Sequence, residues 1–206
     1  QFSREVIVDA IGASHVSIGY DYRYGHNRSG DPAALLEQGA ALGFGVTIVP
    51  AITEDGERVS STAIRALIRE GAVDRAALLL TRPFAIEGEV ITGAQRGRTI
   101  NFPTANIALG DYVRPKFGVY AVRARVDGAS VPGVANIGVK PTVGSPEPLL
   151  EAHLFDFSAD LYGKTIEVDL IAAIREERKF ESFEALRAQI AADAETARKL
   201  LNSPSP

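Results

Sequence analysis

Residues 93–106 read GAQRGRTINFPTAN. The stretch begins as a glycine-punctuated loop that carries Arg96 and Arg98, and it ends with Thr104 and Asn106, two small polar residues. Glycines let backbone amides approach a polyanion closely, and guanidinium groups suit phosphate oxygens. A hydroxyl and an amide oxygen are hard ligands of the kind that Mg²⁺ accepts alongside phosphates. The stretch therefore predicts a site for a metal-bound nucleoside triphosphate.

The same residues have a plainer interpretation. Glycine-rich basic loops are common at turns, so composition alone favours a surface hairpin loop with solvated arginines and a tight proline turn. The stretch is not a Walker A phosphate loop, because no Gly-Lys-Ser or Gly-Lys-Thr follows the glycines. Other features of the chain must decide between the two interpretations.

The composition is that of an ordinary globular protein. The chain has 206 residues, of which 46% are hydrophobic and 23% charged, enough for one large domain or two small ones. A net charge of −4 gives no support for a nucleic-acid surface. No apolar run approaches the roughly 20 residues that span a bilayer, and no secretory signal opens the sequence. We therefore expect a cytoplasmic protein that binds neither nucleic acid nor membranes; the oligomeric state stays open.

The chain contains no cysteine and three histidines. Disulfides and thiolate chemistry are therefore excluded, and zinc would depend on scattered histidines and carboxylates. The sequence starts at Gln1, without methionine and at the edge of a helical pattern. We expect further N-terminal sequence to precede it.

The first part of the chain predicts an α/β layer. Ser3 can cap a short helix that Gly12 ends, and residues 15–19 and 45–50 are short apolar runs typical of buried strands. Between them, Asp31 and Pro32 start a helix that should bury three leucines before Gly43 ends it; these are Leu35, Leu36 and Leu42. Strand, helix, strand in this order predicts parallel strands.

Two more helices are expected before the pattern changes. Hydroxyls at 60–62 open a helix that buries Ile64, Leu67 and Ile68 and stops at Gly71, and a shorter helix covers 74–80. A helix N-terminus with hydroxyls and Arg65 nearby is a natural anion site. Simple N-capping explains the same hydroxyls.

From Phe84 onward the hydrophobic pattern has a period of two. Candidate strands cover 84–92, 119–126, 131–137, 149–155 and 165–174. Strands at this spacing, with turn residues between them, predict an antiparallel barrel or sandwich. Ser182 then caps a last helix with an apolar stripe formed by Phe183, Leu186, Ile190, Ala194, Ala197 and Leu201. We place the domain boundary between residues 83 and 84.

The order of the motifs resembles a known family. After residues 93–106 come Gly118-Val119-Tyr120, Asn136-Ile137-Gly138, Pro141-Thr142, Leu150-Glu151-Ala152-His153, Asp160-Leu161-Tyr162-Gly163 and Ile174-Arg175 with Phe180. This order resembles the riboflavin kinase family. The residues before Phe84 resemble the end of an FMN adenylyltransferase domain, carrying GYDYRYG at 19–25 and SSTAIR at 60–65. The whole chain is similar to the C-terminal two thirds of bacterial bifunctional riboflavin kinase/FAD synthetases.

The resemblance implies a fold and an activity. Residues 1–83 would be part of a Rossmann-like nucleotidylyltransferase domain, and residues 84–206 an antiparallel β-barrel riboflavin kinase domain with a C-terminal helix. The activity would be transfer of the ATP γ-phosphate to the riboflavin 5′-hydroxyl, giving FMN and ADP. The alternative is a flavin- or nucleotide-binding module without turnover. A nucleic-acid-binding barrel is a weaker interpretation, because basic and aromatic residues are sparsely interleaved.

The resemblance also assigns roles in the kinase site. Thr104 and Asn106 would hold Mg²⁺, and Gly93, Gly97 and Arg98 would meet the nucleotide phosphates. Leu154 and Tyr162 would line the adenine pocket, while Arg175 and Phe180 would flank the flavin, where an arginine and an aromatic ring suit stacking.

Glu151 would be the general base. Its position in a strand agrees with this role, because Leu150, Ala152 and Leu154 alternate toward one face and leave Glu151 and His153 on the other. Without the resemblance, Glu151 is more simply an exposed strand carboxylate. We expect His153 to be structural.

A residual adenylyltransferase site is implied as well. Asp21, Arg23 and Arg28 would contact flavin or phosphate, and the ATP phosphates would be held by Ser60, Ser61, Thr62 and Arg65. The H-x-G-H motif of that family does not occur in the sequence, so we expect FAD synthesis to be weak or absent.

Two further positions depart from the family pattern. Asn101 and Thr81 stand where glycine is common. Asparagine tolerates positive φ, so the loop at 93–106 is expected to survive.

Overall fold

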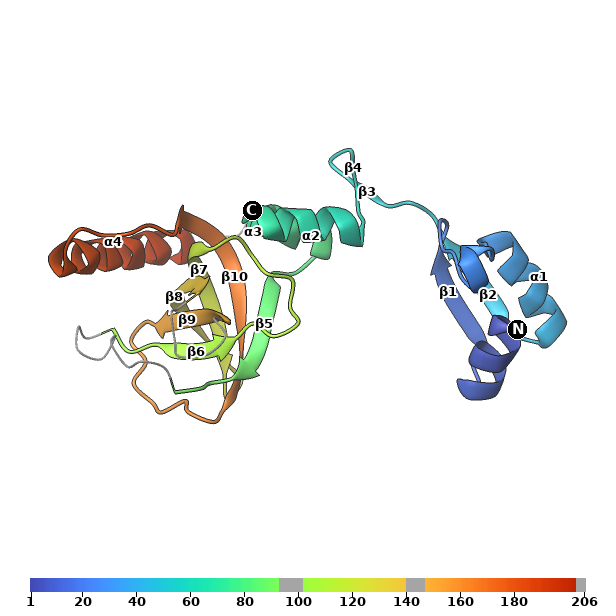
Figure 1. The fold of residues 1–206 in the computed structure, drawn as a ribbon, viewed down its shortest axis with the longest axis horizontal. Coiled ribbons are helices and arrows are strands. Elements are labelled where there is room, and N and C mark those ends of the chain that lie inside the picture. Colours follow the sequence, from blue (N-terminus) through green and yellow to red (C-terminus); the bar gives the residue numbers. More distant parts are fainter. Residues whose placement is uncertain (93–101, 140–146, 203–206) are drawn as a thin grey trace. The chain divides into compact units, whose positions relative to one another are not determined.

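The computed structural model describes residues 1–92, 102–139 and 147–202. The chain divides into two compact units, Gln1–Val59, called here the N-terminal unit, and Ser60–Pro206, called the barrel unit. Figure 1 shows the elements of each unit. None of the helices within the described ranges is long and apolar enough to cross a membrane.

The N-terminal unit contains a small parallel sheet and short helices. Its elements are the π-helix η1 (Ser3–Ala10), β1 (His15–Gly19), the 3₁₀ turn η2 (His26–Arg28), α1 (Pro32–Leu42), β2 (Gly45–Val49), β3 (Thr53–Glu54) and β4 (Glu57–Arg58). β1 and β2 pair in parallel, with His15 opposite Gly45. The predicted α/β layer is confirmed at this level, and its Rossmann-like topology stays a prediction.

The signals at the ends of α1 act as expected. The Asp31 side chain accepts a hydrogen bond of 2.8 Å from the backbone N–H of Ala34, and Gly43 ends the helix in the left-handed region with φ of 84°. Leu35 is 1% exposed, but Leu36 is 44% exposed, so its predicted burial is wrong. Adjacent helical positions point about 100° apart, and the core contacts only the face that carries Leu35.

The barrel unit is dominated by one antiparallel sheet. Its elements are α2 (Ser61–Glu70), α3 (Val73–Leu80), β5 (Phe84–Glu89), β6 (Ala105–Ala108), β7 (Gly118–Val126), β8 (Ala129–Val139), β9 (Pro148–Leu154), β10 (Thr165–Glu176) and α4 (Phe183–Asn202). The strand order is β5-β10-β7-β8-β9-β6, and every neighbouring pair is antiparallel. Just after β5, the Ile91 N–H donates to the Asn106 carbonyl at 2.9 Å. This bridge nearly closes the sheet, so the architecture is a barrel and not a sandwich.

The barrel has two apolar clusters, one inside and one outside. Inside, fully buried side chains such as Ile137, Leu150 and Leu170 fill the interior, and Val73 of α3 joins them. Outside, Val119 and Ala121 of β7 pack with the buried side of α4. Figure 1 shows α4 and the α2–α3 pair on different sides of the barrel. Because β7 is covered on both faces, its inward and outward residues are both apolar.

Some predictions for this unit need correction. Strand β6 was not predicted, because its four residues directly follow the Pro-Thr turn and give no long alternating run. In α4 the predicted stripe is wrong at Phe183, which is 55% exposed. The compact units divide at residues 59 and 60, because α3 packs on β5 and β10. A boundary of family domains at 83 and 84 stays a prediction.

Candidate functional site

Three polar residues from distant parts of the sequence meet in one row across the sheet. Asn106 of β6 and Asn136 of β8 both pair in register with Glu151 of β9. Residues directly opposite in neighbouring strands share a face, and the row continues through Val119 of β7 to Arg175 of β10. This is the outer face of the barrel, because the residues on either side of Glu151 point into the core: Leu150 and Ala152 are 0% and 1% exposed.

The predicted metal ligands lie at one end of this row. Asn106 is 4% exposed, and its Nδ2 donates to the Thr104 carbonyl at 3.3 Å. Its Oδ1 is buried without any hydrogen-bond partner. An orphaned buried oxygen is costly unless a ligand completes it, and an amide oxygen beside a threonine suits Mg²⁺. Within the described ranges no group of three or more His, Asp or Glu side chains could hold a metal ion, so a metal here would depend on these oxygens and on substrate phosphates.

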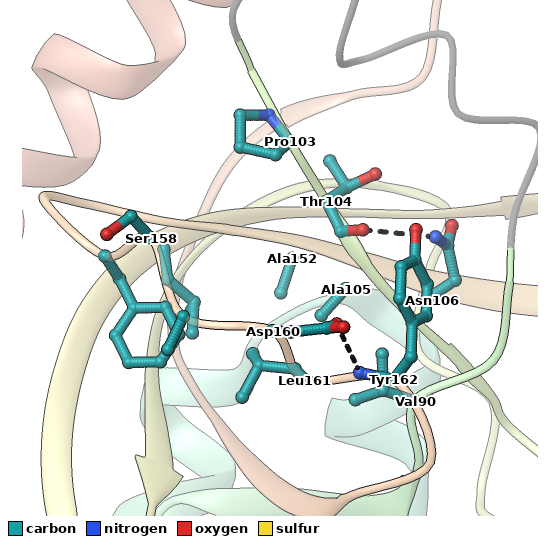
Figure 2. A pocket seen from close by; sticks show the side chains of 13 residues that line it. Val90, Pro103, Thr104, Ala105, Asn106, Ala152, Ser158, Asp160, Leu161 and Tyr162 are labelled. Carbon is teal, nitrogen blue, oxygen red and sulfur yellow. Dashed lines mark hydrogen bonds between the residues drawn. The ribbon is translucent and has the colours of Figure 1, made fainter.

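A pocket of about 340 Å³ opens beside Thr104 and Asn106. Its lining combines the apolar Val90 and Leu161 with Tyr162 and Asp160 (Figure 2). Leu154 lines it as well. The Tyr162 N–H donates to the Asp160 carboxylate at 3.1 Å, which fixes the 160–162 turn at the pocket wall. Both predicted adenine-pocket residues, Leu154 and Tyr162, therefore line this pocket together with both predicted metal ligands.

Phe157 and Asp160 also line the pocket, and sequence reasoning gave neither residue a role. The sequence did contain a signal for Asp160, because this residue begins the Asp160-Leu161-Tyr162-Gly163 motif. Phe157 had none, because an aromatic residue after a strand is as often part of the core.

His153 supports the Pro-Thr segment. Its Nδ1 lies 2.9 Å from the Pro103 carbonyl oxygen, which requires an Nδ1–H that donates. Its ring lies 4.7 Å from that of Phe102 and 5.9 Å from that of Phe155. These contacts fit the expected structural role and tie β9 to the residues that precede β6.

Arg175 is held by a partner that the sequence analysis missed. Its Nε lies 3.0 Å from both carboxylate oxygens of Asp193 in α4, and its Nη2 lies 2.8 Å from Oδ2. The two side chains are only 19% and 5% exposed, and Gln189 donates to Asp193 at 2.7 Å. The available signal was spacing: Asp193 falls three residues after Ile190 and four before Ala197, on the buried stripe of α4.

Phe180 lies against two cations. The guanidinium carbons of Arg175 and Arg178 are 5.5 Å and 4.9 Å from the centre of its ring. The predicted flavin-binding pair, Arg175 and Phe180, is therefore in contact, and one edge of the arginine is occupied by α4.

The predicted residual adenylyltransferase residues fall in both units. In the N-terminal unit, Asp21 pairs with Arg58 at 2.5 Å, and this hydrogen bond lowers the pKa of the Asp21 carboxyl below its ordinary value. Arg23 lies 3.7 Å from Asp31, and Arg28 has φ of 56° in the polar loop.

In the barrel unit, Ser60 Oγ accepts the Ala63 N–H at 3.1 Å and caps α2. Ser61, Thr62 and Arg65 are exposed on its first turns. A common site for these residues and those of the N-terminal unit stays a prediction. Gly93, Gly97 and Arg98, predicted to meet phosphates, lie outside the described residues, as does Asn101.

The structure defines a class of protein by its fold, a nearly closed six-stranded antiparallel barrel with a pocket beside Thr104 and Asn106. The family model for riboflavin kinase matches residues 80–201, and the model for FAD synthetase matches residues 1–63. The chain belongs to the riboflavin kinase family.

The relatives match nearly the whole chain. The bifunctional riboflavin kinase/FMN adenylyltransferase of Escherichia coli K12 is 42% identical over 206 residues, which are 100% of this chain and 66% of the relative. The protein of the same description from Bacillus subtilis is 40% identical and covers 96% of this chain and 63% of its own length. A crystal structure described as a macrolide-efflux protein from Streptococcus pneumoniae matches with a TM-score of 0.80 and 33% identity, over 98% of this chain and 64% of that chain. The chain thus spans about two thirds of the length of these relatives.

Proposed function

We propose that this chain carries the riboflavin kinase activity of a bifunctional enzyme that also makes FAD. The reaction transfers the γ-phosphate of ATP to the 5′-hydroxyl of riboflavin and releases FMN and ADP. One observation carries the proposal: half-buried Glu151 lies in register opposite Asn106, whose amide oxygen is buried without a partner. Asn106 in turn lines a pocket whose size suits a nucleotide. We place the reaction in the cytoplasm, where ATP is available as the phosphoryl donor.

Glu151 acts as the general base in this mechanism. It accepts the proton of the riboflavin 5′-hydroxyl while the hydroxyl oxygen forms a bond to the γ-phosphorus, and the bond from that phosphorus to the β–γ bridging oxygen breaks. Proton transfer of this kind contributes roughly 10²–10⁴-fold to a rate. Leu154 and Tyr162 hold the adenine, and Arg175 with Phe180 orients the flavin ring.

Asn106 Oδ1 and Thr104 fit a Mg²⁺ ion, because one is a buried oxygen without a partner and the other offers a neighbouring hydroxyl. When bound, the ion neutralises charge on the transferred phosphoryl group. The protein residues supply the positioning. We include Gly93, Gly97 and Arg98 in the proposal as backbone and guanidinium contacts to the nucleotide phosphates.

The proposal extends to a residual FMN adenylyltransferase site. Asp21, Arg23 and Arg28 contact flavin or phosphate, and Arg65 with the hydroxyls of 60–62 contacts the phosphates of a second ATP. The match of the FAD synthetase model to residues 1–63 supports this part. The ion pair of Asp21 with Arg58 must open, or be reached from outside, for Asp21 to contact a ligand.

Chromatography of flavins tests both activities at once. The chain is incubated with riboflavin, ATP and Mg²⁺, and riboflavin, FMN and FAD are separated. We expect FMN, and a fall of about 10²–10⁴-fold in its rate of formation for Glu151→Gln. Glu89→Gln, which changes an exposed strand carboxylate of β5, should leave the rate unchanged.

Three outcomes separate the alternatives. FMN formation that survives Glu151→Gln removes Glu151 from the role of base. Flavin binding without any FMN favours a binding module over an enzyme. FAD in the product mixture shows that the adenylyltransferase site functions in this chain.

A further inference from the structure

The side chain of Glu177, just beyond β10, reaches the outer face of β8. Strands β8 and β10 both pair antiparallel with β7, so they run in the same direction. Gly138 follows Asn136 by two positions in β8, and Glu177 follows Arg175 by two positions. Alternation puts Gly138 on the same face as Asn136. Glu177 and Gly138 therefore lie at the same level, beside the row that contains Glu151.

Gly138 leaves the space that the Glu177 carboxylate occupies. A Cβ at Gly138 would lie 2.6 Å from Glu177 Oε1 and 3.3 Å from Asn136 Nδ2. Real Cβ atoms do not come as close to another atom as the first of these distances, so a side chain at this position would displace the carboxylate. The carboxylate of Glu177 and the amide of Asn136 thus both lie close to one point above this glycine.

The residues on either side of Glu177 are held by other contacts. Arg175 Nη1 donates to the Glu176 carbonyl at 3.0 Å, which fixes the backbone just before Glu177. On the other side, the Arg178 guanidinium donates to the side-chain oxygen of Gln189 in α4. The chain is therefore anchored to β10 and to α4, and Glu177 is the residue between the two anchors that reaches β8.

The polar groups gathered at this face lack protein partners. Among the residues that the structure describes, the side chains of Glu177 and Asn136 make no hydrogen bond and no ion pair. Asn106 Oδ1, farther along the row, is buried without a partner. A carboxylate only accepts hydrogen bonds, whereas an amide both donates and accepts them. Such a set suits a ligand that carries several hydroxyl groups.

We propose that Glu177 and Asn136 bind hydroxyl groups of the ribityl chain of riboflavin. The inference rests on the proposed kinase function, which puts the flavin ring at Arg175 and Phe180 and the reacting 5′-hydroxyl at Glu151. In the row across the sheet, Asn136 lies between Glu151 and Arg175. The remaining ribityl hydroxyls, which join the ring to the reacting end, therefore meet the Asn136 amide and the Glu177 carboxylate.

This contact makes the two residues determinants of specificity. A site built to hydrogen-bond a hydroxyl group rejects an analogue that lacks it far more strongly than an apolar pocket rejects a misfit. Hydrogen bonds to a carboxylate are also stronger than those between neutral groups. Glu177 and Asn136 thus select flavins with a polyhydroxylated side chain, and Gly138 keeps the carboxylate in place.

The test compares riboflavin with lumiflavin, which has the same ring system with a methyl group in place of the ribityl chain. Binding of each flavin to the full chain is measured by fluorescence quenching, with ADP in place of ATP so that no phosphoryl transfer occurs. Glu177→Ala should weaken riboflavin binding by at least about tenfold, the typical loss for one charge-assisted hydrogen bond, and leave lumiflavin binding unchanged. Gly138→Ala should have the same effect, because its Cβ displaces the carboxylate. Combined with Glu177→Ala, it should add little.

Glu176→Ala is the matched control. It removes the neighbouring carboxylate, which is 74% exposed and pairs with Lys116 at 2.6 Å. Exposed ion pairs contribute little to stability, so the affinities for both flavins should stay at the values of the parent chain.

Two outcomes overturn the inference. One is an unchanged riboflavin affinity in Glu177→Ala, and the other is an equal loss of affinity for riboflavin and lumiflavin, which would place the effect at the ring. FMN formation, assayed separately with ATP, keeps the inference apart from the proposed function. A parent chain that forms no FMN but shows the riboflavin-specific loss contradicts the kinase proposal and supports the ribityl contact. FMN formation together with an unchanged riboflavin affinity in Glu177→Ala contradicts the ribityl contact alone.

Discussion

The two compact units close their sheets to different degrees. In the barrel unit, six strands pair in sequence around the core, and the Ile91–Asn106 bridge nearly joins the two edges. In the N-terminal unit, β1 and β2 pair only with each other among the described residues. Parallel strands are usually covered on both faces, yet Ile48 and Val49 of β2 are 36% and 37% exposed.

This difference predicts that the less stable unit is not the one that carries the proposed kinase site. A two-stranded sheet is marginal by itself, whereas a closed barrel pairs its edges and buries its core. The proposed kinase residues within the described ranges all lie in the barrel unit. We therefore expect the N-terminal unit to open first and the kinase site to persist when it does.

The strongest test removes one buried leucine from each unit. Leu170 of β10 is 0% exposed and Leu35 of α1 is 1% exposed. Each change to alanine should cost about 2–5 kcal/mol of unfolding free energy. Leu170→Ala should lower barrel stability and kinase activity together. Leu35→Ala should unfold the N-terminal unit and leave FMN formation intact.

Hydrogen exchange resolves the two units, because protection factors are read amide by amide. We expect Leu35→Ala to lower protection in β1 and β2 but not in β7 and β8. If protection falls equally in both units, they unfold together and the comparison above fails.

The next effect concerns the ion pair between β10 and α4. Asp193→Asn keeps the shape of the side chain but leaves Arg175 without its carboxylate, which should cost about 2 kcal/mol. Because Arg175 then loses its fixed orientation toward Phe180, we expect the KM for riboflavin to rise about tenfold while the KM for ATP stays unchanged. Steady-state kinetics with each substrate varied in turn measures both.

Asp156→Asn is the matched control. It breaks a second contact of α4, the pair of Asp156 with Arg198 at 3.1 Å, in which Asp156 is 82% exposed. Exposed pairs contribute about 0–1 kcal/mol, so neither KM should change. A parallel rise of both KM values in Asp193→Asn would mean general loosening of the barrel and no positioning role.

The sequence predicted most strands of the barrel, because the signals are local. Alternation placed β9 with Leu150 inward and Glu151 outward, and the structure agrees. The meeting of Asn106, Glu151 and Asn136 is not local: it depends on the register of three strands. Only the resemblance to a family assigned Glu151 and Asn106 to one site in advance.

Asp193 and the arginines around α2 show which contacts could not be predicted from the sequence. A carboxylate on a helix is exposed in most proteins, and its burial here depends on an arginine 18 positions earlier in the sequence. In the same way, the sequence indicated Arg65 as an anion contact of α2. Arg114 lines the same hollow as Arg65 because residues 111–117, which connect β6 to β7, line it too. Contacts of this kind follow from tertiary packing, which a periodic pattern does not encode.

A smaller effect is expected at Thr81, which lies shortly before β5 and has a positive φ. It caps α3 with φ of 58°, a region that β-branched residues avoid. The left-handed conformation costs an L-residue about 1–2 kcal/mol, and glycine avoids this cost at the expense of a more flexible unfolded chain. Thr81→Gly should therefore stabilise the barrel unit by about 1 kcal/mol.

Thr196→Gly provides the contrast, because Thr196 lies in helical conformation within α4. Its side chain donates to the Ala192 carbonyl, and glycine inside a helix costs about 1 kcal/mol. The same substitution should thus have opposite signs at the two threonines in denaturant melts. Destabilisation at both sites would show that the Thr81 backbone carries no strain.

The smallest effect compares one carboxylate from each unit. In the N-terminal unit, the hydrogen bond from Arg58 lowers the pKa of Asp21. In β10, burial raises the pKa of Asp169, and the Arg125 guanidinium at 2.9 Å offsets this only in part. Titration of the carboxyl carbons by NMR should therefore show Asp169 taking up its proton at higher pH than Asp21.

The consequences for stability have opposite signs. Asp21 is held ionised in the folded state, so its stabilising contribution is present above the ordinary aspartate pKa and is lost as pH falls through the lowered value. Asp169 binds its proton more tightly when folded, so the barrel loses stability as pH rises from the ordinary aspartate pKa through the raised value. As the pH falls from neutral, the barrel unit should therefore gain stability through protonation of Asp169 before the N-terminal unit loses stability through protonation of Asp21. Asp169→Asn should remove the pH dependence of barrel stability and leave that of the N-terminal unit unchanged. If the barrel dependence survives the substitution, it does not arise from Asp169.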